Sequence, residues 1–390
     1  MTAKLFSLLM GLSCMCILST QAQDLDTLVD VGGYDLHFVI WEGEGMPILL
    51  AAGGGNDATV WTRTDFVEQL QRITQTTIIT YDRSGFGQSE YDPKLADDQK
   101  SLIDYGVRDL EIGLTKLGYD RDLIFVGHSY GGFYAALFAH QYPERVQGMV
   151  LIDANHICYY SEEYVEGLKE EWTEAWFANI RNISEPVYFE CLSFFETIEH
   201  MRGIEIDPEM PVIDLVAEDP PFDSLNDVSW RDCHADFVAA SPQREGILAA
   251  DCDHYLHFDN PSLTINAITK IFAQVDGSVD QAAILERSLA YNLQSANQYR
   301  EQEYDYWHSE QDFNGWGYRL LNEEELAQAI AVFALNTALF PQSANAWDSY
   351  GEALLLAGRE TEAIEMYQKS LALNPNNQNA REILERLKKK

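Results

Sequence analysis

A serine flanked by glycines is the first part of the chain whose residue types and spacing suggest chemistry. The stretch reads Gly127-His-Ser-Tyr-Gly131, between an apolar run at 123–126 and a helix-forming run at 133–139. A serine on a tight strand-to-helix turn presents its hydroxyl above the sheet edge, and the glycines avoid clashes in the bend. The amide dipoles of the following helix favour an anion at the same place. The pattern predicts that Ser129 is a nucleophile.

A nucleophilic serine needs a base, and two histidines follow a late apolar run at 247–250. His254 lies nearest the end of that predicted strand, where a loop can reach the serine turn. His257 lies where the chain approaches the next helix, and we expect it to pack or to bond locally. We therefore predict that His254 is the base. The other histidines that we considered are expected to be structural or solvated: His37, His140 and His234.

A third group must orient the imidazole and stabilise the imidazolium. Asp153 follows the apolar run at 149–152, and Glu218 and Asp219 follow the run at 212–217. Both places fit the chain order serine, acid, histidine. The residues alone leave this choice open.

Short apolar runs that alternate with amphipathic helices must position these groups. An opening hairpin followed by such runs predicts a mostly parallel sheet with helices on both faces. The predicted strands are 27–31, 36–41, 48–52, 77–81, 123–126, 149–152, 212–217 and 247–250.

The alternation is interrupted at about 155–208 by a helical segment rich in aromatic residues. We expect these side chains to form the core of an inserted cap, which would roof the carboxyl edge of the sheet where such proteins bind ligands. The aromatic residues are Tyr159, Tyr160, Trp172, Trp176, Phe177, Phe194 and Phe195.

The C-terminal region has a repeat of 34 residues. The period and the residue types resemble tetratricopeptide repeats, which place an aromatic residue, a glycine, a small residue and a closing proline at these positions. Two repeats and a capping helix at 378–389 seldom bury enough core alone, so we expect them to dock on the first domain or on a second chain. The pairs at this offset are Phe313/Trp347, Trp316/Tyr350, Gly317/Gly351, Leu320/Leu354, Ala329/Ala363, Phe333/Tyr367 and Pro341/Pro375.

The N-terminus resembles a secretory signal. A single Lys4, a short apolar run at 5–18 and small residues before about Ala22 predict cleavage near that alanine and export to the periplasm or the medium. The apolar run is too short for a comfortable membrane span. The predicted organisation is a signal peptide at 1–22, a first domain at 24–275, a helical connector at 276–309 and repeats at 310–390.

The net charge of the chain indicates which binding partners are not expected. The formal net charge of −37 repels phosphate backbones, so nucleic acid is not expected as a partner, and the many acidic residues are interpreted as a solvated surface.

After the signal four cysteines remain, which in an exported chain suggests up to two disulfides, paired in one of three possible ways. No pair has the spacing that zinc sites favour, and we predict no metal. The four are Cys158, Cys191, Cys233 and Cys252.

Together these motifs resemble the α/β-hydrolase superfamily over about residues 25–274. The first of these motifs is the serine turn. The stretch Tyr81 to Ser89 is similar to the D-x-R-G-x-G-x-S pattern of the family, and the stretch His254 to Pro261 is similar to its G-H-x-x-H-x-x-x-P pattern. The resemblance implies an α/β fold with a mostly parallel sheet and a helical cap. It also implies that the first histidine of the late pattern, His254, is catalytic.

The resemblance also implies an oxyanion hole, with one departure from the family. Where a histidine is usual in the H-G-x-x-G…W pattern, this chain has Ala52, followed by three glycines and, later, Trp61. Counting back from Trp61, the backbone amides of Gly54 and Tyr130 are expected to bind the oxyanion. Backbone donors do not need the missing histidine.

The acid departs from the family more clearly. Many members carry Gly-x-x-Asp after the seventh strand, and Pro220 holds that place here. Other members place the acid at the end of the sixth strand, where Asp153 falls. We therefore favour Asp153 over Asp219, with Glu218 third.

The sequence leads to two hypotheses about function. The preferred one is an exported serine hydrolase of carboxylesterase type that acts on a small acyl substrate and needs neither metal nor organic cofactor. The serine disfavours the aspartate-ester routes of epoxide hydrolases and dehalogenases. The alternative is an inert hydrolase fold that recruits partners, or a second copy, through its repeats.

Overall fold

The computed structural model describes residues 25–97, 103–220, 228–281, 283–284, 287–288, 290–292 and 310–388. The predicted signal peptide at 1–22 lies outside the described residues, as does the second half of the predicted connector.

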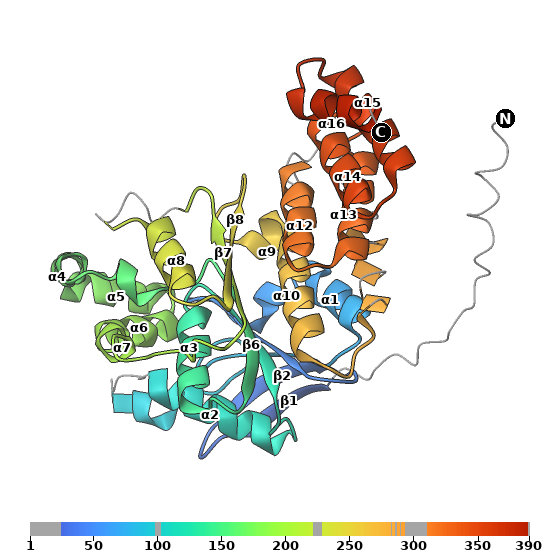
Figure 1. Cartoon of the computed structure of the whole chain (residues 1–390). Helices are drawn as coiled ribbons and strands as arrows, with labels where there is room; N and C mark the ends of the chain where they lie inside the picture. The colour runs from blue at the N-terminus through green and yellow to red at the C-terminus, as the bar shows by residue number, and fades with distance from the viewer. Residues whose placement is uncertain are drawn as a thin grey trace.

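A single sheet of eight strands forms the centre of the described chain (Figure 1). Its order is β1-β2-β4-β3-β5-β6-β7-β8. The strand β2 pairs antiparallel with β1 and β4, and all other neighbours are parallel. The mostly parallel sheet predicted from the sequence is therefore confirmed. The strands are β1 (Leu25–Asp30), β2 (Asp35–Trp41), β3 (Ile48–Ala51), β4 (Ile78–Tyr81), β5 (Leu123–His128), β6 (Val146–Ile152), β7 (Val212–Ala217) and β8 (Arg244–Ala249).

Two hydrophobic cores cover the two faces of this sheet. Along β5, Leu123 and Phe125 point into one core, and Ile124 and Val126 point into the other, because successive side chains of a strand alternate. Helices α2 (Ile103–Lys116), α3 (Gly131–Gln141) and α8 (Trp230–Ala239) pack in the first core, and α1 (Phe66–Thr74) and α10 (Pro261–Val275) pack in the second. Burial on both faces explains the uninterrupted apolar runs of the central strands.

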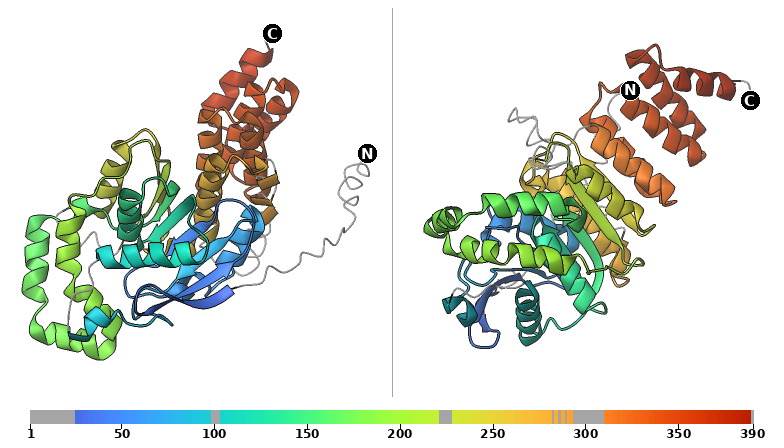
Figure 2. Two further views of the ribbon diagram at one scale, coloured as in Figure 1. Left: turned by 90° about the horizontal axis from the view of Figure 1, so that it is seen from below. Right: turned by 90° about the vertical axis from the view of Figure 1, so that its left-hand side faces the viewer.

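Short helices occupy the interval between β6 and β7, within the range predicted for the cap. In Figures 1 and 2 they form a group beside the sheet, on the side opposite the C-terminal helices. They are η3 (Ile157–Tyr159), α4 (Glu162–Glu171), α5 (Glu174–Ile183), α6 (Glu185–Leu192) and α7 (Phe194–Met201).

The C-terminal region consists of two helix pairs and a last helix. Each helix of the second pair begins 34 residues after its counterpart, in agreement with the sequence period. Gly317 lies under the ring of Phe333, and Gly351 lies under the ring of Tyr367, so both pairs use a glycine and an aromatic residue in the same way. The helices are α12 (Glu310–Asn322), α13 (Leu326–Leu339), α14 (Ala344–Leu356), α15 (Glu360–Leu373) and α16 (Gln378–Lys388).

Ion pairs join the first of these helices to the sheet domain. Lys270 of α10 pairs with Glu323 and with Glu245 of β8, each at 2.6 Å. Arg319 of α12 also pairs with Glu245, at 2.6 Å. The helical region therefore contacts the edge of the sheet domain, which is one of the two placements that we expected for so short an array.

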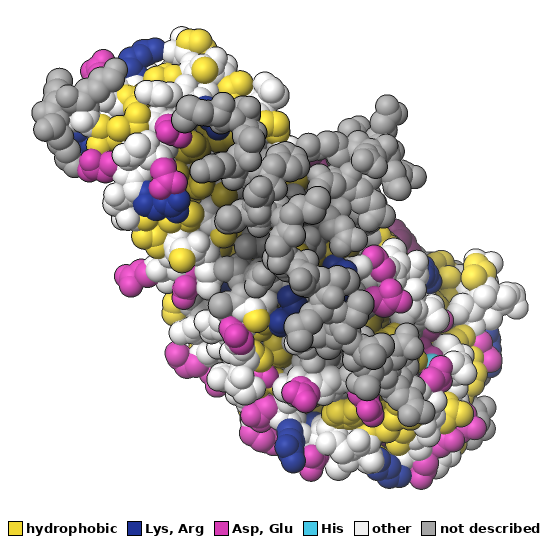
Figure 3. Space-filling model, turned by 90° about the vertical axis from the view of Figure 1, so that its right-hand side faces the viewer, with side chains coloured by type: hydrophobic (Ala, Val, Ile, Leu, Met, Phe, Trp, Pro, Cys, Tyr) yellow, Lys and Arg dark blue, Asp and Glu magenta, His cyan; other side chains and the backbone are white. Residues whose placement is uncertain are grey.

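The disulfides, membrane span and acidic surface considered in the sequence analysis can be compared with the structure. Cys158 of η3 and Cys233 of α8 form a disulfide, and Cys191 and Cys252 are thiols, so one of the two bridges that the sequence allowed is formed. In the part of the chain that the structure describes, no helix is long and apolar enough to cross a membrane. Carboxylates are scattered over the face shown in Figure 3 and do not gather in one patch.

Candidate active site

Ser129 stands on the turn between β5 and α3. Its φ of +51° is unusual for a residue with a side chain, and the turn leaves no room for side chains at the flanking glycines. A Cβ atom on Gly127 would lie 2.5 Å from the carbonyl oxygen of Gly131, and one on Gly131 would strike the carbonyl of Ala51. The glycines are therefore required by close backbone approach, and the bend leaves Ser129 partly exposed above the sheet edge.

His254 lies in the loop after β8, and Nδ1 of its ring is 2.6 Å from Oδ2 of Asp153. Asp153 is the first residue after β6 and is fully buried. Its φ of +42° also lies in the left-handed region, and its amide donates to the carbonyl of Leu215 at 2.7 Å. This backbone turn directs the carboxylate off the end of the strand and toward the histidine loop.

The second oxygen of the Asp153 carboxylate has two donors of its own. Oδ1 accepts the backbone amide of Ala217 at 3.0 Å and the indole Nε1 of Trp230 at 2.9 Å. The two oxygens therefore have separate partners: Oδ1 is held by the scaffold, and Oδ2 faces the imidazole. Because Asp153 receives Nδ1–H of His254, the other ring nitrogen, Nε2, can act as a base.

The two alternative acids predicted from sequence lie at the end of β7 and make other contacts. The Glu218 carboxylate accepts the amide of Asp251 at 2.9 Å. The backbone of Asp219 contacts the carbonyl of Cys252 at 3.4 Å. The structure thus brings Asp153, and not these residues, to Nδ1 of His254.

The second histidine of the late stretch packs in the core. His257 is fully buried, and its ring lies 4.7 Å from that of Trp61 and 4.3 Å from that of Phe258. Neither ring nitrogen has a hydrogen-bond partner within the described residues. Burial, followed by the nearby His254, lowers the pKa of His257 to about 3, so this ring is neutral.

His128, the residue before the serine, is also buried, and its Nε2 lies 3.0 Å from the carbonyl oxygen of His254. Burial, followed by the neighbouring His257 and His254, places its pKa well below the usual value. Nε2 of a neutral His128 can therefore donate to that carbonyl and fix the backbone of the histidine loop. The histidines that the sequence set aside have structural contacts: His37 with Asp82 and Asp26, His140 with the carbonyl of Glu205, and His234 with Asp214.

The loop proposed to supply the oxyanion hole lies directly against the serine turn. A Cβ atom on Gly53 would be 2.8 Å from the His128 ring and 3.1 Å from Cβ of Ser129. A Cβ atom on Gly54 would be 3.5 Å from Cβ of Tyr130. Within the described residues, the amides of Gly54 and Tyr130 donate no hydrogen bond to another protein group. Both amides are therefore free to bind a ligand oxygen.

A buried arginine supports this loop from beneath. The guanidinium of Arg83 donates to the carbonyls of Ala52 at 2.6 Å and Gly53 at 2.9 Å. It also pairs with Glu190 of the cap helix α6 at 3.1 Å. The other oxygen of Glu190 accepts the amide of Gly55 at 2.9 Å. The cap and the oxyanion loop are therefore connected through one ion pair.

One group of side chains in the described part of the chain has the composition of a metal site: His156, Asp214 and His234, whose ligand atoms lie within 4.8 Å of one another. Hydrogen bonds already join them. Nδ1 of His234 is 2.8 Å from Oδ2 of Asp214, and Nε2 of His156 is 3.3 Å from Oδ1. These bonds account for the convergence of the three side chains.

Sequence reasoning missed three residues of this site. Arg83 stands in the Asp-x-Arg turn that the family resemblance had already identified, and its type and position were a usable signal. Trp230 and Glu190 lie in segments with no recognised motif. Their contacts depend on how the cap and α8 fold back over the sheet, which local sequence does not reveal.

Comparison with known proteins agrees with this architecture. Residues 46–166, from just before β3 to the first cap helix, match the family model described as alpha/beta hydrolase fold. An uncharacterized protein of Mycobacterium tuberculosis is 38% identical over 127 residues, which are 33% of this chain and 34% of the relative. A proline iminopeptidase of Saccharolobus solfataricus is 27% identical over 139 residues, 34% of this chain and 43% of the enzyme. The chain thus spans less than half the length of these relatives.

Among solved structures, a thermophilic esterase from Thermogutta terrifontis is similar, with a TM-score of 0.46, 22% identity, and coverage of 65% of this chain and all of the esterase. The segment 46–166 that matches the family model contains the serine turn and Asp153. Together with the eight-stranded, mostly parallel sheet and the strand-to-helix serine turn, the match to the family model shows that the chain has the α/β-hydrolase fold.

Proposed function

We propose that the chain is an exported serine hydrolase that acts by acyl transfer on a carboxylic ester or a related small acyl substrate. The observation that supports this most directly is the contact of 2.6 Å between Asp153 and Nδ1 of His254, formed beside a serine turn with the geometry of a nucleophile elbow. The proposed roles are Ser129 as nucleophile, His254 as base and Asp153 as the orienting acid.

In the first half-reaction, Nε2 of His254 takes the proton from Ser129 as Oγ attacks the substrate carbonyl carbon. The carbonyl oxygen becomes an oxyanion, and the amides of Gly54 and Tyr130 donate to it. His254 then returns the proton to the departing alcohol oxygen, and the acyl group remains on Ser129. Asp153 stabilises the imidazolium during both proton transfers.

In the second half-reaction, water takes the place of the alcohol. His254 removes a proton from the water, the resulting hydroxide attacks the acyl carbonyl, and the same amides hold the second oxyanion. Collapse of this intermediate returns the proton to Oγ of Ser129 and releases a carboxylic acid. The net reaction consumes one ester and one water and yields one acid and one alcohol.

A small cavity of about 30 Å³ lies beside Tyr130, the residue after the serine, and is also lined by Tyr134 and by Phe189 of the cap helix α6. The buried Arg83 and Glu190 form a paired polar patch in its wall. Ser129, His254 and Gly54 are not among its lining residues, so the proposed substrate class rests on the catalytic groups and not on this cavity.

The test is covalent labelling of the full-length protein by a fluorophosphonate, combined with hydrolysis of a panel of p-nitrophenyl esters of increasing acyl length. We expect the probe on Ser129, and we expect Ser129→Ala to lose both labelling and turnover. Ser343→Ala, which removes the N-cap serine just before α14, is the control and should keep the wild-type labelling and turnover. A folded wild-type protein that is neither labelled nor active would favour the inert scaffold instead.

We also propose export and a stabilising role for the C-terminal helices as tetratricopeptide repeats. The disulfide supports export, because such bonds persist in oxidising compartments. The ion pairs of Lys270 and Arg319 with the sheet domain support the second role. N-terminal sequencing of the protein recovered from the periplasm or medium should begin after about Ala22. Removal of residues 276–390 should lower the Tm and leave the order of preferred esters unchanged.

A further inference from the structure

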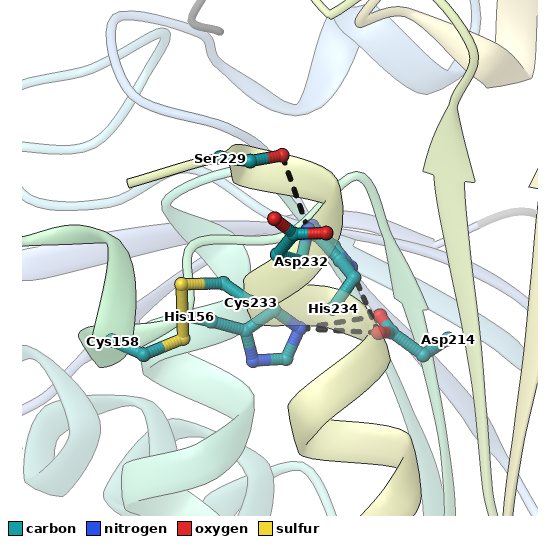
Figure 4. Close-up of a disulfide and its surroundings, with 7 residues drawn as sticks. All are labelled: His156, Cys158, Asp214, Ser229, Asp232, Cys233 and His234. Atoms are coloured by element: carbon teal, nitrogen blue, oxygen red, sulfur yellow. Dashed lines mark hydrogen bonds and ion pairs between the residues drawn. A yellow bond between two sulfur atoms is a disulfide. The ribbon is translucent and has the colours of Figure 1, made fainter. Parts of the chain in front are cut away.

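Helix α8 carries three buried side chains that fasten it to the segment following β6. Trp230, Cys233 and His234 lie at positions i, i+3 and i+4, which share one face of a helix. Trp230 bonds Asp153, Cys233 bonds Cys158 and His234 bonds Asp214. Figure 4 shows the last two contacts side by side, with His156 between the disulfide and Asp214.

The first contact acts on the proposed catalytic acid itself. Among the described residues, two groups donate to Oδ1 of Asp153: the indole of Trp230 and the backbone amide of Ala217. With Oδ1 held at two points, the carboxylate cannot turn away from His254. Because the backbone at Asp153 is also in a disfavoured conformation, the side-chain direction depends on these bonds.

The other two contacts hold α8 in place relative to the same segment. The disulfide joins α8 to η3, only five residues beyond Asp153. The group of His156, Asp214 and His234 joins α8, the segment and the strand β7. Burial alone would raise the pKa of Asp214, but His234 and His156 bring it down to about 2, so the carboxylate is ionised. Burial opposes a proton on His234, yet Asp214 raises the pKa of His234 overall, so the 2.8 Å contact favours a protonated ring beside an ionised carboxylate.

Other charged groups around the cluster fit the same interpretation. Burial, the largest cause, lowers the pKa of His156, so that this ring stays neutral beside the charged pair. Arg244 faces Asp214 from β8, and Asp153 faces His234. Charged protein groups therefore surround the cluster, and its hydrogen bonds join α8 to β7.

We propose that α8 is the positioning element of the catalytic acid, with Trp230 as a positioning residue, and that the Cys158–Cys233 disulfide makes turnover sensitive to thiol reduction. The inference rests on the proposed function, because it assigns Asp153 the role of the acid.

The reductive step is a thiol–disulfide exchange with dithiothreitol as the reductant. A thiolate of dithiothreitol attacks one sulfur, and the other leaves as a thiolate that takes a proton. The second thiol of dithiothreitol, as its thiolate, then displaces the protein sulfur from the mixed disulfide. Two electrons pass to the protein, which gains two thiols, and dithiothreitol becomes a cyclic disulfide. Loss of the covalent link leaves α8 held by its core packing and by the contacts of Trp230 with Asp153 and of His234 with Asp214, so its hold on Asp153 becomes looser.

The first experiment measures steady-state kinetics of Trp230→Phe in the full-length protein. Loss of a hydrogen bond to a charged group should lower kcat by about tenfold to a hundredfold, with KM nearly unchanged. Trp347→Phe is the matched control, since its indole donates to the carbonyl of Pro341 in the C-terminal helices. The control should keep the wild-type kcat. A changed KM at unchanged kcat for Trp230→Phe would overturn the positioning role.

The second experiment compares the wild type before and after dithiothreitol with the double variant Cys158→Ser/Cys233→Ser. We expect reduction, verified by alkylation and mass spectrometry, to lower kcat of the wild type to that of the double variant, and to leave the double variant unchanged. Full reduction without a change in kcat would overturn the redox part. Stoichiometric zinc in the purified wild type would overturn the interpretation of the histidine cluster as an ion pair.

Fluorophosphonate labelling of the wild type separates these failures from failure of the proposed function. A wild type that the probe does not label at Ser129 contradicts the hydrolase assignment. A labelled and active wild type, together with unchanged kcat in Trp230→Phe, contradicts only the role of α8.

Discussion

The carboxylate of Asp153, at the end of β6, lies 2.6 Å from Nδ1 of His254, in the loop after β8. The end of β7, where many proteins of this fold carry their acid, holds Glu218 and Asp219 in other contacts. In this chain the carboxylate that contacts His254 therefore follows β6, the neighbour of the strand β5 that ends at the serine turn.

This relationship predicts the effect of changing the acid. Asp153→Asn keeps the size of the side chain but favours the wrong tautomer of His254, so kcat should fall by about 10³- to 10⁴-fold. The controls Asp219→Asn and Glu218→Gln should stay near the wild type in the same ester assay. A larger loss in Asp219→Asn than in Asp153→Asn would contradict the assignment.

Stability in acid should depend on the buried His257. The folded protein keeps this ring neutral down to about pH 3, whereas the unfolded chain takes up the proton below about pH 6.5. The free energy of unfolding should therefore fall as the pH drops through this window, with a contribution from His257 on the order of 5 kcal/mol. Urea unfolding of His257→Phe at several pH values should show a shallower pH dependence. His140→Gln, at an exposed histidine, should keep the wild-type slope.

Gly131, the last residue of the serine turn, should be important for stability. A methyl group on Gly131 would strike the carbonyl of Ala51, so Gly131→Ala should cost about 1–3 kcal/mol and lower the Tm. The matched control is Gly167→Ala in α4, where a Cβ atom meets nothing within 4 Å. That variant should gain about 0.5–1 kcal/mol, because alanine favours helix. Differential scanning calorimetry measures both, and a neutral Gly131→Ala would contradict the close approach.

Docking of the C-terminal helices should depend on Glu245, which pairs with Lys270 and Arg319. Glu245→Gln leaves both cations without their shared partner, so the Tm should fall by an amount that corresponds to about 1 kcal/mol, and limited proteolysis should release the helices faster. The control is Glu362→Gln, whose exposed pair with Arg359 lies within α15. It should leave the proteolysis rate unchanged. Equal rates for the two variants would count against docking through this network.

The fold was largely predictable because its signals are local. All eight predicted strands are present. The central strands β3 to β7 are buried runs of apolar residues, and the exposed edge strand β1 was recognised by its hairpin with β2. Strand ends were less exact: β8 begins at Arg244, three residues before the predicted start, because its first residues are polar at the sheet edge. The period of 34 residues likewise anticipated the starts of the C-terminal helices.

The residues alone could choose neither the acid nor the disulfide, since both depend on distances between remote segments, and Asp153 was favoured only through the family resemblance. Asp153 and His254 are 101 residues apart, and Cys158 and Cys233 are 75 residues apart. Helix α8, which carries Cys233, lies between two predicted strands, where the alternation implied a helix but did not give its bounds. Without those bounds, neither the partner of Cys158 nor the donor to Asp153 could be recognised.

The contact between Arg83 and the carbonyl of Gly53 has a consequence for the activation barrier of the proposed reaction. In a trans peptide the C=O and the next N–H point in opposite directions from one plane. A guanidinium that holds the oxygen of Gly53 therefore aims the N–H of Gly54 the other way, away from the arginine. If that amide is the oxyanion donor, its dipole is aligned before the substrate arrives, and little reorganisation energy remains in the barrier.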